Sequence, residues 1–210
     1  MEDIEFIYKP NVQDTPNHKF SIFSTGYRNK NGVAVLASRP REAQDIVWTY
    51  KYITSERAKW ATKELRSMVG AASKQEIDDF KKLQFESATF NGTFSYRNAK
   101  SLVVRSPYIV IDIDDLSSTD EARQVQQQLV NDPKVETDLC FVSPKGKGVK
   151  WVATVPNLAQ RPTFRETFQW FRQYLGFEYG IRIDSSGSDV CRACFLPWDN
   201  ECFINKKYLR

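Results

Sequence analysis

The chain has 210 residues, 41% of them hydrophobic, which is enough for a sizeable core and excludes a disordered chain. Thirty Lys and Arg against 26 Asp and Glu give a net charge of +4, a mild basic excess that permits a nucleic-acid or nucleotide partner without requiring one. No run approaches the roughly 18 apolar residues of a membrane span, and the opening MEDIEFIYKP lacks the pattern of a signal peptide, so we expect a cytoplasmic protein with no membrane partner.

The first hundred residues predict a smaller, helix-rich α/β part that serves as scaffold. Two short extended segments, IEFIY and FSIFSTG, are separated by a loop with Pro and Asn,. From Pro40 to about Gly70, apolar residues recur at three- and four-residue steps, which predicts helices,. We expect Ser55 to cap the second of these. A third helix follows Ser73, whose spacing from Glu76 is that of a capping box,.

After residue 100 the pattern changes to alternating strands and helices. Asn91-Gly92 is a hairpin-type signal just before the change,. The chain then predicts a strand, a helix, two strands, a helix and two more strands, at 108–114, about 119–130, 138–143, 148–155, about 162–175, 181–184 and 192–196. Such an order favours a split βαβ sheet, ferredoxin-like or RNA-recognition-motif-like, with helices on one face. We therefore divide the chain at 1–100 and 101–210.

The first candidate chemical feature is the stretch YIVIDIDDL at 108–116. Side chains alternate along a strand, so Asp112 and Asp114 point to one face while Ile109, Ile111 and Ile113 point to a core on the other. The two aspartates are roughly 6.5 Å apart at Cα, two strand rises, which lets both carboxylates reach the same Mg²⁺ or Mn²⁺. The alternative is that they merely end the strand. Asp115 is expected in the turn.

The second feature is the glycine-lysine segment SPKGKGVKWV at 143–152. Gly146 and Gly148 allow a tight turn, and Lys145, Lys147 and Lys150 are cations suited to phosphate. The segment lacks the spacing of a Walker A loop, and its end indicates an outgoing strand rather than a helix. The alternative is a solvated basic hairpin with no ligand.

The third feature is the stretch IRIDSSGSDVCRACFLPWD at 181–199. Asp184 could be a third metal ligand, and Arg192 could hold a phosphate through two hydrogen bonds. Alternatively, Asp184 caps the following Ser/Gly turn, and Arg192 pairs with Asp189 or Glu201.

The four cysteines all lie from position 140 onward: Cys140, Cys191, Cys194 and Cys202. In a reducing cytosol we expect thiols rather than disulfides. Cys191, Cys194 and Cys202 have partial zinc spacing, but a structural zinc site needs four ligands and the single histidine, His18, is distant in sequence,. Small buried hydrophobic residues are therefore the favoured interpretation over a zinc site.

Taken in order, VIDIDDL, SPKGKGVKWV and RIDSSGSDVCRACFLPWD resemble the three motifs of the archaeo-eukaryotic primase superfamily, of the primase-polymerase type. The chain looks closest to the branch with a VirE N-terminal or BT4734-like domain, found in bacterial and phage mobile-element proteins. The similarity also takes in FESATFNGTFSYRNAKSL and the helices before it, and so covers most of residues 40–205.

The resemblance implies a DNA primase-polymerase: a metal-dependent nucleotidyltransferase with an RNA-recognition-motif-like catalytic sheet, which makes or extends primers on single-stranded DNA from NTPs or dNTPs. It implies two Mg²⁺ or Mn²⁺ ions at catalytic residues Asp112, Asp114 and Asp184, and a triphosphate on the hairpin. The nucleotide-binding residues would be Ser143, Lys145, Gly146, Lys147, Gly148, Lys150 and Arg192. Relatives are often fused to helicases. Much of the superfamily has histidine where this chain has Lys150, although the closest branch also favours lysine.

Two rival functions remain open at the level of sequence. One is a nucleic-acid- or nucleotide-binding replication module of the same fold that has lost turnover. The other is a phosphohydrolase of the haloacid dehalogenase type, since IVIDIDDL also resembles its first motif. That class places the first aspartate near the start of a doubly wound domain, whereas more than 100 residues precede Asp112 here.

Overall fold

The computed structural model describes residues 18–155 and 163–209. The predicted strand IEFIY lies outside these residues. The strands are β1 (Phe20–Phe23), β2 (Tyr27–Arg28), β3 (Ala34–Val35), β4 (Glu42–Gln44), β5 (Ser87–Thr89), β6 (Gly92–Phe94), β7 (Leu102–Arg105), β8 (Tyr108–Ile113), β9 (Thr137–Val142), β10 (Val149–Thr154), β11 (Cys194–Phe195) and β12 (Phe203–Ile204). The α-helices are α1 (Ile46–Thr54), α2 (Lys59–Met68), α3 (Lys74–Gln84), α4 (Thr119–Val130) and α5 (Phe164–Tyr179).

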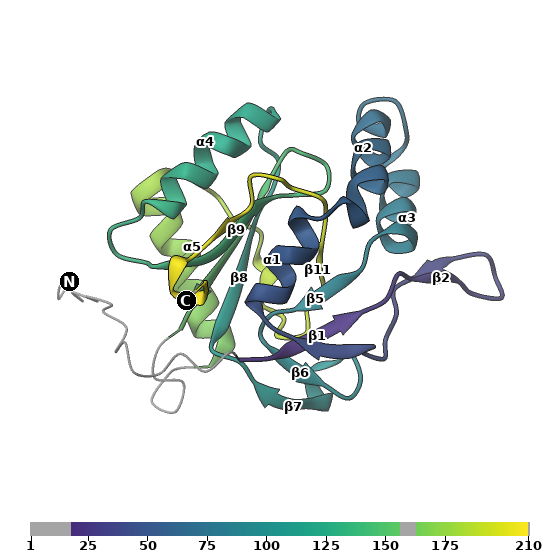
Figure 1. The fold of residues 1–210 in the computed structure, drawn as a ribbon, viewed down its shortest axis with the longest axis horizontal. Coiled ribbons are helices and arrows are strands. Elements are labelled where there is room, and N and C mark those ends of the chain that lie inside the picture. The colour runs from purple at the N-terminus through teal and green to yellow at the C-terminus, as the bar shows by residue number, and fades with distance from the viewer. Residues whose placement is uncertain (1–17, 156–162, 210) are drawn as a thin grey trace.

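The chain is a mixed α/β protein in which the described strands form two four-stranded sheets and two short ribbons (Figure 1). The first sheet has the order β11-β5-β1-β4, and the second has the order β12-β9-β10-β8. Every strand pair in the described part is antiparallel. A doubly wound parallel sheet, which the phosphohydrolase alternative requires, is therefore absent from residues 18–155 and 163–209.

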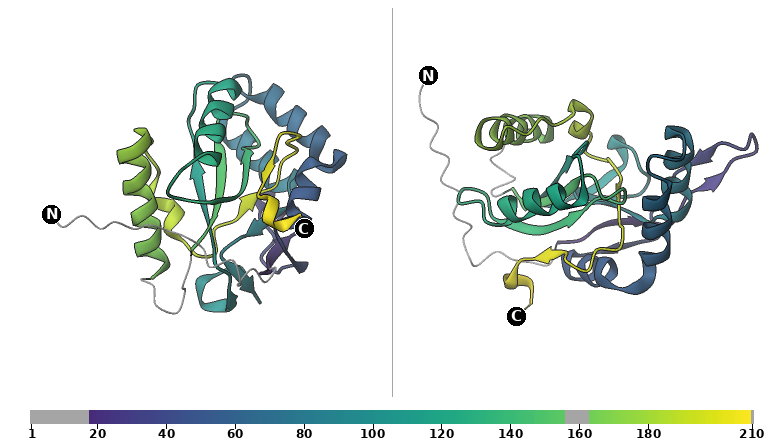
Figure 2. Two further views of the ribbon diagram at one scale, coloured as in Figure 1. Left: turned by 60° about the vertical axis from the view of Figure 1, so that its left-hand side comes forward. Right: turned by 90° about the horizontal axis from the view of Figure 1, so that it is seen from above.

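Two apolar clusters cover the two faces of the second sheet, and Figure 2 shows the ribbon of this sheet from two further sides. On one face, Ile109, Ile111 and Ile113 of β8 pack with residues of α4 and α5. On the other face, Val110 of β8 packs with Ile46 of α1 and with residues of the first sheet. The core on the isoleucine face confirms the prediction from the sequence,. The second core, on the Val110 face, is not predicted from the sequence; burial on both faces explains why β8 is continuously apolar from Tyr108 to Ile111,.

Several local predictions are confirmed. The helices α3, α4 and α5 and the strands β8, β9 and β10 lie within a few residues of their predicted bounds. The Ser73 hydroxyl accepts a hydrogen bond from the Glu76 amide, and the Glu76 carboxylate accepts one from the Ser73 amide, as a capping box requires,. The β8-α4-β9 unit with β10 between its strands is the predicted split βαβ arrangement.

Four local predictions are wrong, and strand pairing distant in sequence explains the first two of them. Residues 42–44, predicted helical, form β4 on the edge of β1, and α1 begins only after its cap, Asp45. The strands on either side of Asn91-Gly92 do not form a hairpin, because β5 pairs with β1 and β6 pairs with β7. Residues 181–184 form no strand. Ser55 caps the 3₁₀ turn Glu56–Ala58 that precedes α2 rather than α2 itself.

The predicted strand at 192–196 exists as β11 but joins the first sheet, where Cys194 pairs with Ala88 of β5. The fourth strand of the second sheet is β12 instead, beside β9. Residues on both sides of position 100 therefore share one sheet and one apolar cluster. No helix among the described residues is long and apolar enough to span a membrane.

Candidate functional site

Strand β8 carries the acidic pair to the edge of a pocket. Asp112 continues the face of Val110, and its side chain is 21% exposed. Asp114 follows the last strand residue, and its side chain is 43% exposed. Asp115 has a φ of 61° and is the turn residue, as the sequence predicts; aspartate tolerates this left-handed conformation better than most residues.

The β9-β10 connection, residues 143–148, lies beside this turn. The Ser143 amide donates to the Gly148 carbonyl at 2.8 Å, and the Gly146 amide donates to the Ser143 carbonyl at 2.9 Å. Gly146 has a φ of +79°, which glycine adopts without strain,. The Leu116 amide donates to the Lys147 carbonyl at 3.1 Å. This hydrogen bond ties the glycine-lysine hairpin to the acidic turn.

Gly148 lies against the end of β8, where there is no room for a side chain. A Cβ atom at this position would lie 2.5 Å from the Ile113 carbonyl oxygen, 3.1 Å from Ser143 Oγ and 3.3 Å from Asp114 Oδ1. Because Gly148 has no side chain, the Ser143 hydroxyl and the Asp114 carboxylate can both lie next to its Cα. Ser143 Oγ is buried and has no hydrogen-bond partner in the described part of the protein.

Lys150 of β10 lies directly opposite Asp112 of β8 in the strand register. Its Nζ forms an ion pair with Asp112 Oδ1 and lies 3.9 Å from Asp114 Oδ1. Arg192 Nη2 is 3.7 Å from the second oxygen of Asp112. The three sequence motifs thus meet at Asp112, which lies between two cations.

These side chains line a pocket of about 360 Å³. The predicted site residues that line it are Asp112, Asp114, Ser143, Lys145, Lys150 and Arg192. Five cationic side chains and three carboxylates face the pocket in total, an excess of positive charge. A concave site with this charge balance favours an anionic ligand.

Burial changes the protonation equilibria in the pocket. Burial of the ammonium group lowers the pKa of Lys150 from 10.5 to about 8, so the charged form still predominates at neutral pH. Burial also raises the pKa of Asp114, and the cation of Lys145 opposes that rise. Both shifts are of the kind found at functional sites.

Four predicted residues do not line the pocket. Gly146 and Gly148 shape its hairpin, and Lys147 is exposed. Asp184 is also exposed, and its carbonyl accepts a hydrogen bond from the Gly187 amide at 3.4 Å. The predicted grouping of Asp184 with Asp112 and Asp114 is not seen.

The remaining pocket residues are not among the predicted site residues. Leu36, Lys81, Arg97, Asp189 and Phe195 all line the pocket. Lys81 belongs to helix α3, which the sequence assigns to scaffold, and its Nζ lies 6.0 Å from the centre of the Phe195 ring. Arg97 falls in FSYRN, within the resembling segment, where its spacing predicts no chemistry. Asp189 and Phe195 lie within the third sequence feature, where Asp189 is considered only as a possible ion-pair partner of Arg192.

The donor set fits one type of metal. Asp112, Asp114 and the unpartnered hydroxyl of Ser143 supply hard oxygen atoms to the pocket, and Mg²⁺ is typically held by one or two carboxylates together with substrate phosphates. Within residues 18–155 and 163–209, no three His, Cys, Asp or Glu side chains gather as a metal-binding group. Asp112 and Asp114 are therefore the residues that would hold a divalent cation.

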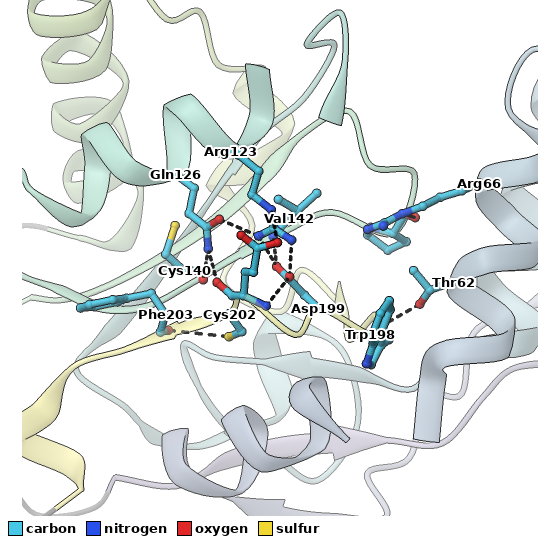
Figure 3. A network of polar contacts seen from close by, with 12 residues as sticks. Thr62, Arg66, Arg123, Gln126, Cys140, Val142, Trp198, Asp199, Cys202 and Phe203 are labelled. Atoms are coloured by element: carbon cyan, nitrogen blue, oxygen red, sulfur yellow. Dashed lines mark hydrogen bonds and ion pairs between the residues drawn. The ribbon is translucent and has the colours of Figure 1, made fainter. Parts of the chain in front are cut away.

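A network of polar contacts around Asp199 lies next to the end of β9, where the pocket hairpin begins (Figure 3). The Asp199 carboxylate accepts a hydrogen bond from the Val142 amide at 2.8 Å and one from Arg123 Nη1 at 3.0 Å. Gln126 Nε2 donates to the Cys140 carbonyl at 2.8 Å. Because Val142 immediately precedes Ser143, this network fixes the end of β9 where the hairpin begins. No sequence motif predicts it.

All four cysteine side chains are buried, as expected for small hydrophobic residues. Cys140 belongs to the apolar cluster beneath α4 and α5, and Cys194 and Cys202 belong to the cluster shared with the first sheet. Burial raises the pKa of the Cys191 and Cys194 thiols to about 11.

Comparison with protein-family models matches residues 80–203, more than half of the chain, to the model described as BT4734-like, N-terminal domain. The matched segment contains β8, the glycine-lysine hairpin and Arg192. No curated protein and no solved structure matches the chain. The resemblance to the BT4734-like branch is thereby confirmed.

Proposed function

The chain belongs to the BT4734-like N-terminal domain family, and from this premise and the geometry of the pocket we propose that it is a metal-dependent nucleotidyltransferase of the primase-polymerase type. The observation that carries the proposal is the meeting of Asp112 and Asp114 with Lys145, Lys150 and Arg192 around one pocket. On this proposal the second sheet, with its split βαβ unit, is the RNA-recognition-motif-like catalytic sheet of the archaeo-eukaryotic primases.

The pocket walls suit a nucleoside triphosphate. Lys145, Lys150 and Arg192 offset the charge of the phosphates. Leu36 and Phe195 give the pocket an apolar wall, where the nucleoside packs. The positive excess is smaller than the charge of a triphosphate, so a divalent cation supplies the remainder.

The reaction proposed is attack of a primer 3′-hydroxyl, or of an initiating nucleotide, on the α-phosphate, with pyrophosphate leaving. Asp112 and Asp114 would hold Mg²⁺ or Mn²⁺, which stabilises the attacking and leaving oxygens when bound. The cationic side chains of the pocket hold the β- and γ-phosphates in place. The template is single-stranded DNA, and a helicase is a partner consistent with this role.

The test is incorporation of labelled NTP and dNTP on primed and primer-free single-stranded templates, with Mg²⁺ and with Mn²⁺. Wild-type protein is expected to incorporate label, and Asp114→Asn and Asp112→Asn are expected to abolish incorporation. Asp120→Asn, at an exposed position of α4, is the matched control and is expected to retain activity. Because Asp112→Asn removes a partner of buried Lys150, thermal unfolding checks its fold. Full activity in a folded Asp114→Asn variant would contradict the proposal.

A second candidate is a nucleotide-binding replication module without turnover. The position of Asp184, exposed and outside the pocket, favours it, because only two carboxylates of the predicted three line the pocket. Nucleotide binding by the wild type without incorporation on any template would select this candidate.

A further inference from the structure

Lys150 is a buried cation placed on the acidic pair itself. Its residue is 7% exposed, and its position in the interior of β10 fixes it opposite Asp112. A buried ammonium group needs a charged or hydrogen-bonding partner, because leaving it unpaired is costly. The Asp112 carboxylate is that partner, and Asp114 is within 3.9 Å.

The second oxygen of Asp112 also faces a cation, Arg192, at 3.7 Å. The charges of the acidic pair are thus offset by side chains of the protein itself. Lys81 adds to the positive field that acts on both Asp114 and Lys150. A divalent cation that approaches the pair has to displace the Lys150 ammonium or bear its repulsion at close range.

A polyphosphate offers Lys150 and Arg192 a different partner. Both side chains line the same pocket as Lys145, so phosphate oxygens entering the pocket compete with Asp112 for them. When Lys150 or Arg192 moves from Asp112 to a phosphate oxygen, the repulsion that a divalent cation meets at Asp112 and Asp114 becomes weaker. Binding of one ligand therefore favours binding of the other, and this coupling is reciprocal.

We propose that Lys150 is an internal counter-ion that keeps a divalent cation off Asp112 and Asp114 until an anionic ligand draws it away, so that cation and nucleotide bind with positive coupling. The identity of the anion rests on the function proposed above. The competition between Lys150 and the cation does not, because it follows from the ion pair alone. An unpaired acidic site would bind the cation first and independently.

The test is calorimetric titration of Mn²⁺ alone into nucleotide-free wild-type, Lys150→Met and Lys147→Met proteins. Lys147→Met removes the same charge from an exposed position of the same hairpin. We expect Lys150→Met to bind Mn²⁺ about tenfold more tightly than the wild type, and Lys147→Met to match the wild type. Equal Mn²⁺ affinities in wild-type and Lys150→Met proteins would overturn the proposal.

Should Lys150→Met fail to fold, Arg192→Gln provides the same comparison, because its side chain is 33% exposed and tolerates replacement better. About a threefold gain in Mn²⁺ affinity is expected from it, and no gain would count against the proposal.

The coupling is measured separately with a fluorescent dATP analogue, whose affinity is compared with and without excess Mn²⁺. The ratio of the analogue's dissociation constants without and with Mn²⁺ is expected to be about tenfold in the wild type and clearly smaller in Lys150→Met. An unchanged ratio would refute the coupling. If these binding differences are seen but the wild-type protein incorporates no nucleotide, only the function proposed above is contradicted.

Discussion

Arg123 and Asp199 form a two-pronged ion pair across the end of β9, in which Nη1 lies 3.0 Å from Oδ2 and Nη2 lies 2.5 Å from Oδ1, and the Asp199 side chain has no exposed surface. The same carboxylate accepts hydrogen bonds from the amides of Val142 and Glu201. The pair therefore joins α4, β9 and the segment before β12 (Figure 3). Its position behind Ser143 makes it a support for the pocket rather than a part of it.

Replacement of Asp199 by Ala is expected to lower the free energy of unfolding by about 3–5 kcal/mol, because it leaves a partly buried guanidinium and a buried amide without their acceptor. Urea unfolding measures the loss. Glu201→Ala is the control, since that carboxylate is 67% exposed and lies 3.8 Å from Arg123; a change below about 1 kcal/mol is expected. Similar losses in the two variants would contradict a special role for Asp199.

Replacement of Gly148 by Ala is expected to destabilise the protein by about 1–3 kcal/mol, because the new methyl group would collide with the Ile113 carbonyl 2.5 Å away,. It also crowds Ser143 and Asp114, so ligand affinity falls with stability. Gly176→Ala in α5 is the matched control, because the nearest atom lies 3.9 Å away, and it is expected to stabilise the helix by about 0.5–1 kcal/mol. Thermal and urea unfolding compare the two; a neutral Gly148→Ala would contradict the close approach.

Replacement of Arg97 by Ala is expected to weaken binding of a fluorescent dNTP by about 10- to 100-fold, if its guanidinium contacts the phosphates as its place in the pocket predicts,. Fluorescence anisotropy gives the affinity. Arg97 Nε also donates to the Ala37 carbonyl at 3.2 Å, so thermal unfolding monitors the fold. Arg39→Ala, exposed and outside the pocket, is the control; equal affinities in the two variants would exclude a role for Arg97.

The fall of the unfolding free energy at acid pH is expected to depend on three glutamates at helix N-termini. Their carboxylates accept hydrogen bonds from the hydroxyl and amide of a nearby Ser or Thr, and these bonds lower the pKa of each below 4.5; the pairs are Glu76 with Ser73, Glu121 with Ser117, and Glu166 with Thr163. A lowered folded-state pKa gives stability that is present above the unfolded-state pKa and is lost as the pH falls through both values.

Replacing all three glutamates by Gln is therefore expected to flatten the fall of the unfolding free energy between pH 6 and pH 3, because Gln keeps an acceptor but does not titrate over that range. Urea unfolding at several pH values measures the slope. Glu64→Gln, on the exposed face of α2, is the control. An unchanged slope in the triple variant would show that the caps contribute nothing to acid stability.

The sequence predicts elements whose side-chain pattern and capping residues agree with each other. The alternation of residues 108–113 predicts which face of β8 carries the isoleucines to a core, and the Ser73 and Glu76 spacing predicts the start of α3. The prediction of a strand at 181–184 fails for a local reason. Gly180 ends α5 with a φ of 67°, and the Ile181 amide donates to the Leu175 carbonyl. That amide closes the helix, and Ile183 satisfies the apolar pattern by packing alone.

The acidic pair and the hairpin are predictable because each is contiguous and strand pairing brings them together. Leu36, Lys81 and Arg97 are not, since they come from three separate segments that only the tertiary fold places against β8. Lys150 shows the limit most clearly. The glycine-lysine segment predicts that Lys150 binds phosphate. Its register opposite Asp112 gives it a competing partner within the protein, which the segment alone does not predict.

The pairing of β11 with β5 has a consequence for how the chain acquires its structure during synthesis. The first sheet is completed by Cys194 and Phe195, more than 100 residues after β5, so its edge stays open until nearly the whole described chain has left the ribosome. Contacts of such long sequence separation slow folding, and an open strand edge invites aggregation meanwhile. The yield of soluble protein is therefore expected to rise with added chaperone and at lower growth temperature. The rise should be larger than for a protein whose sheets close between neighbouring strands.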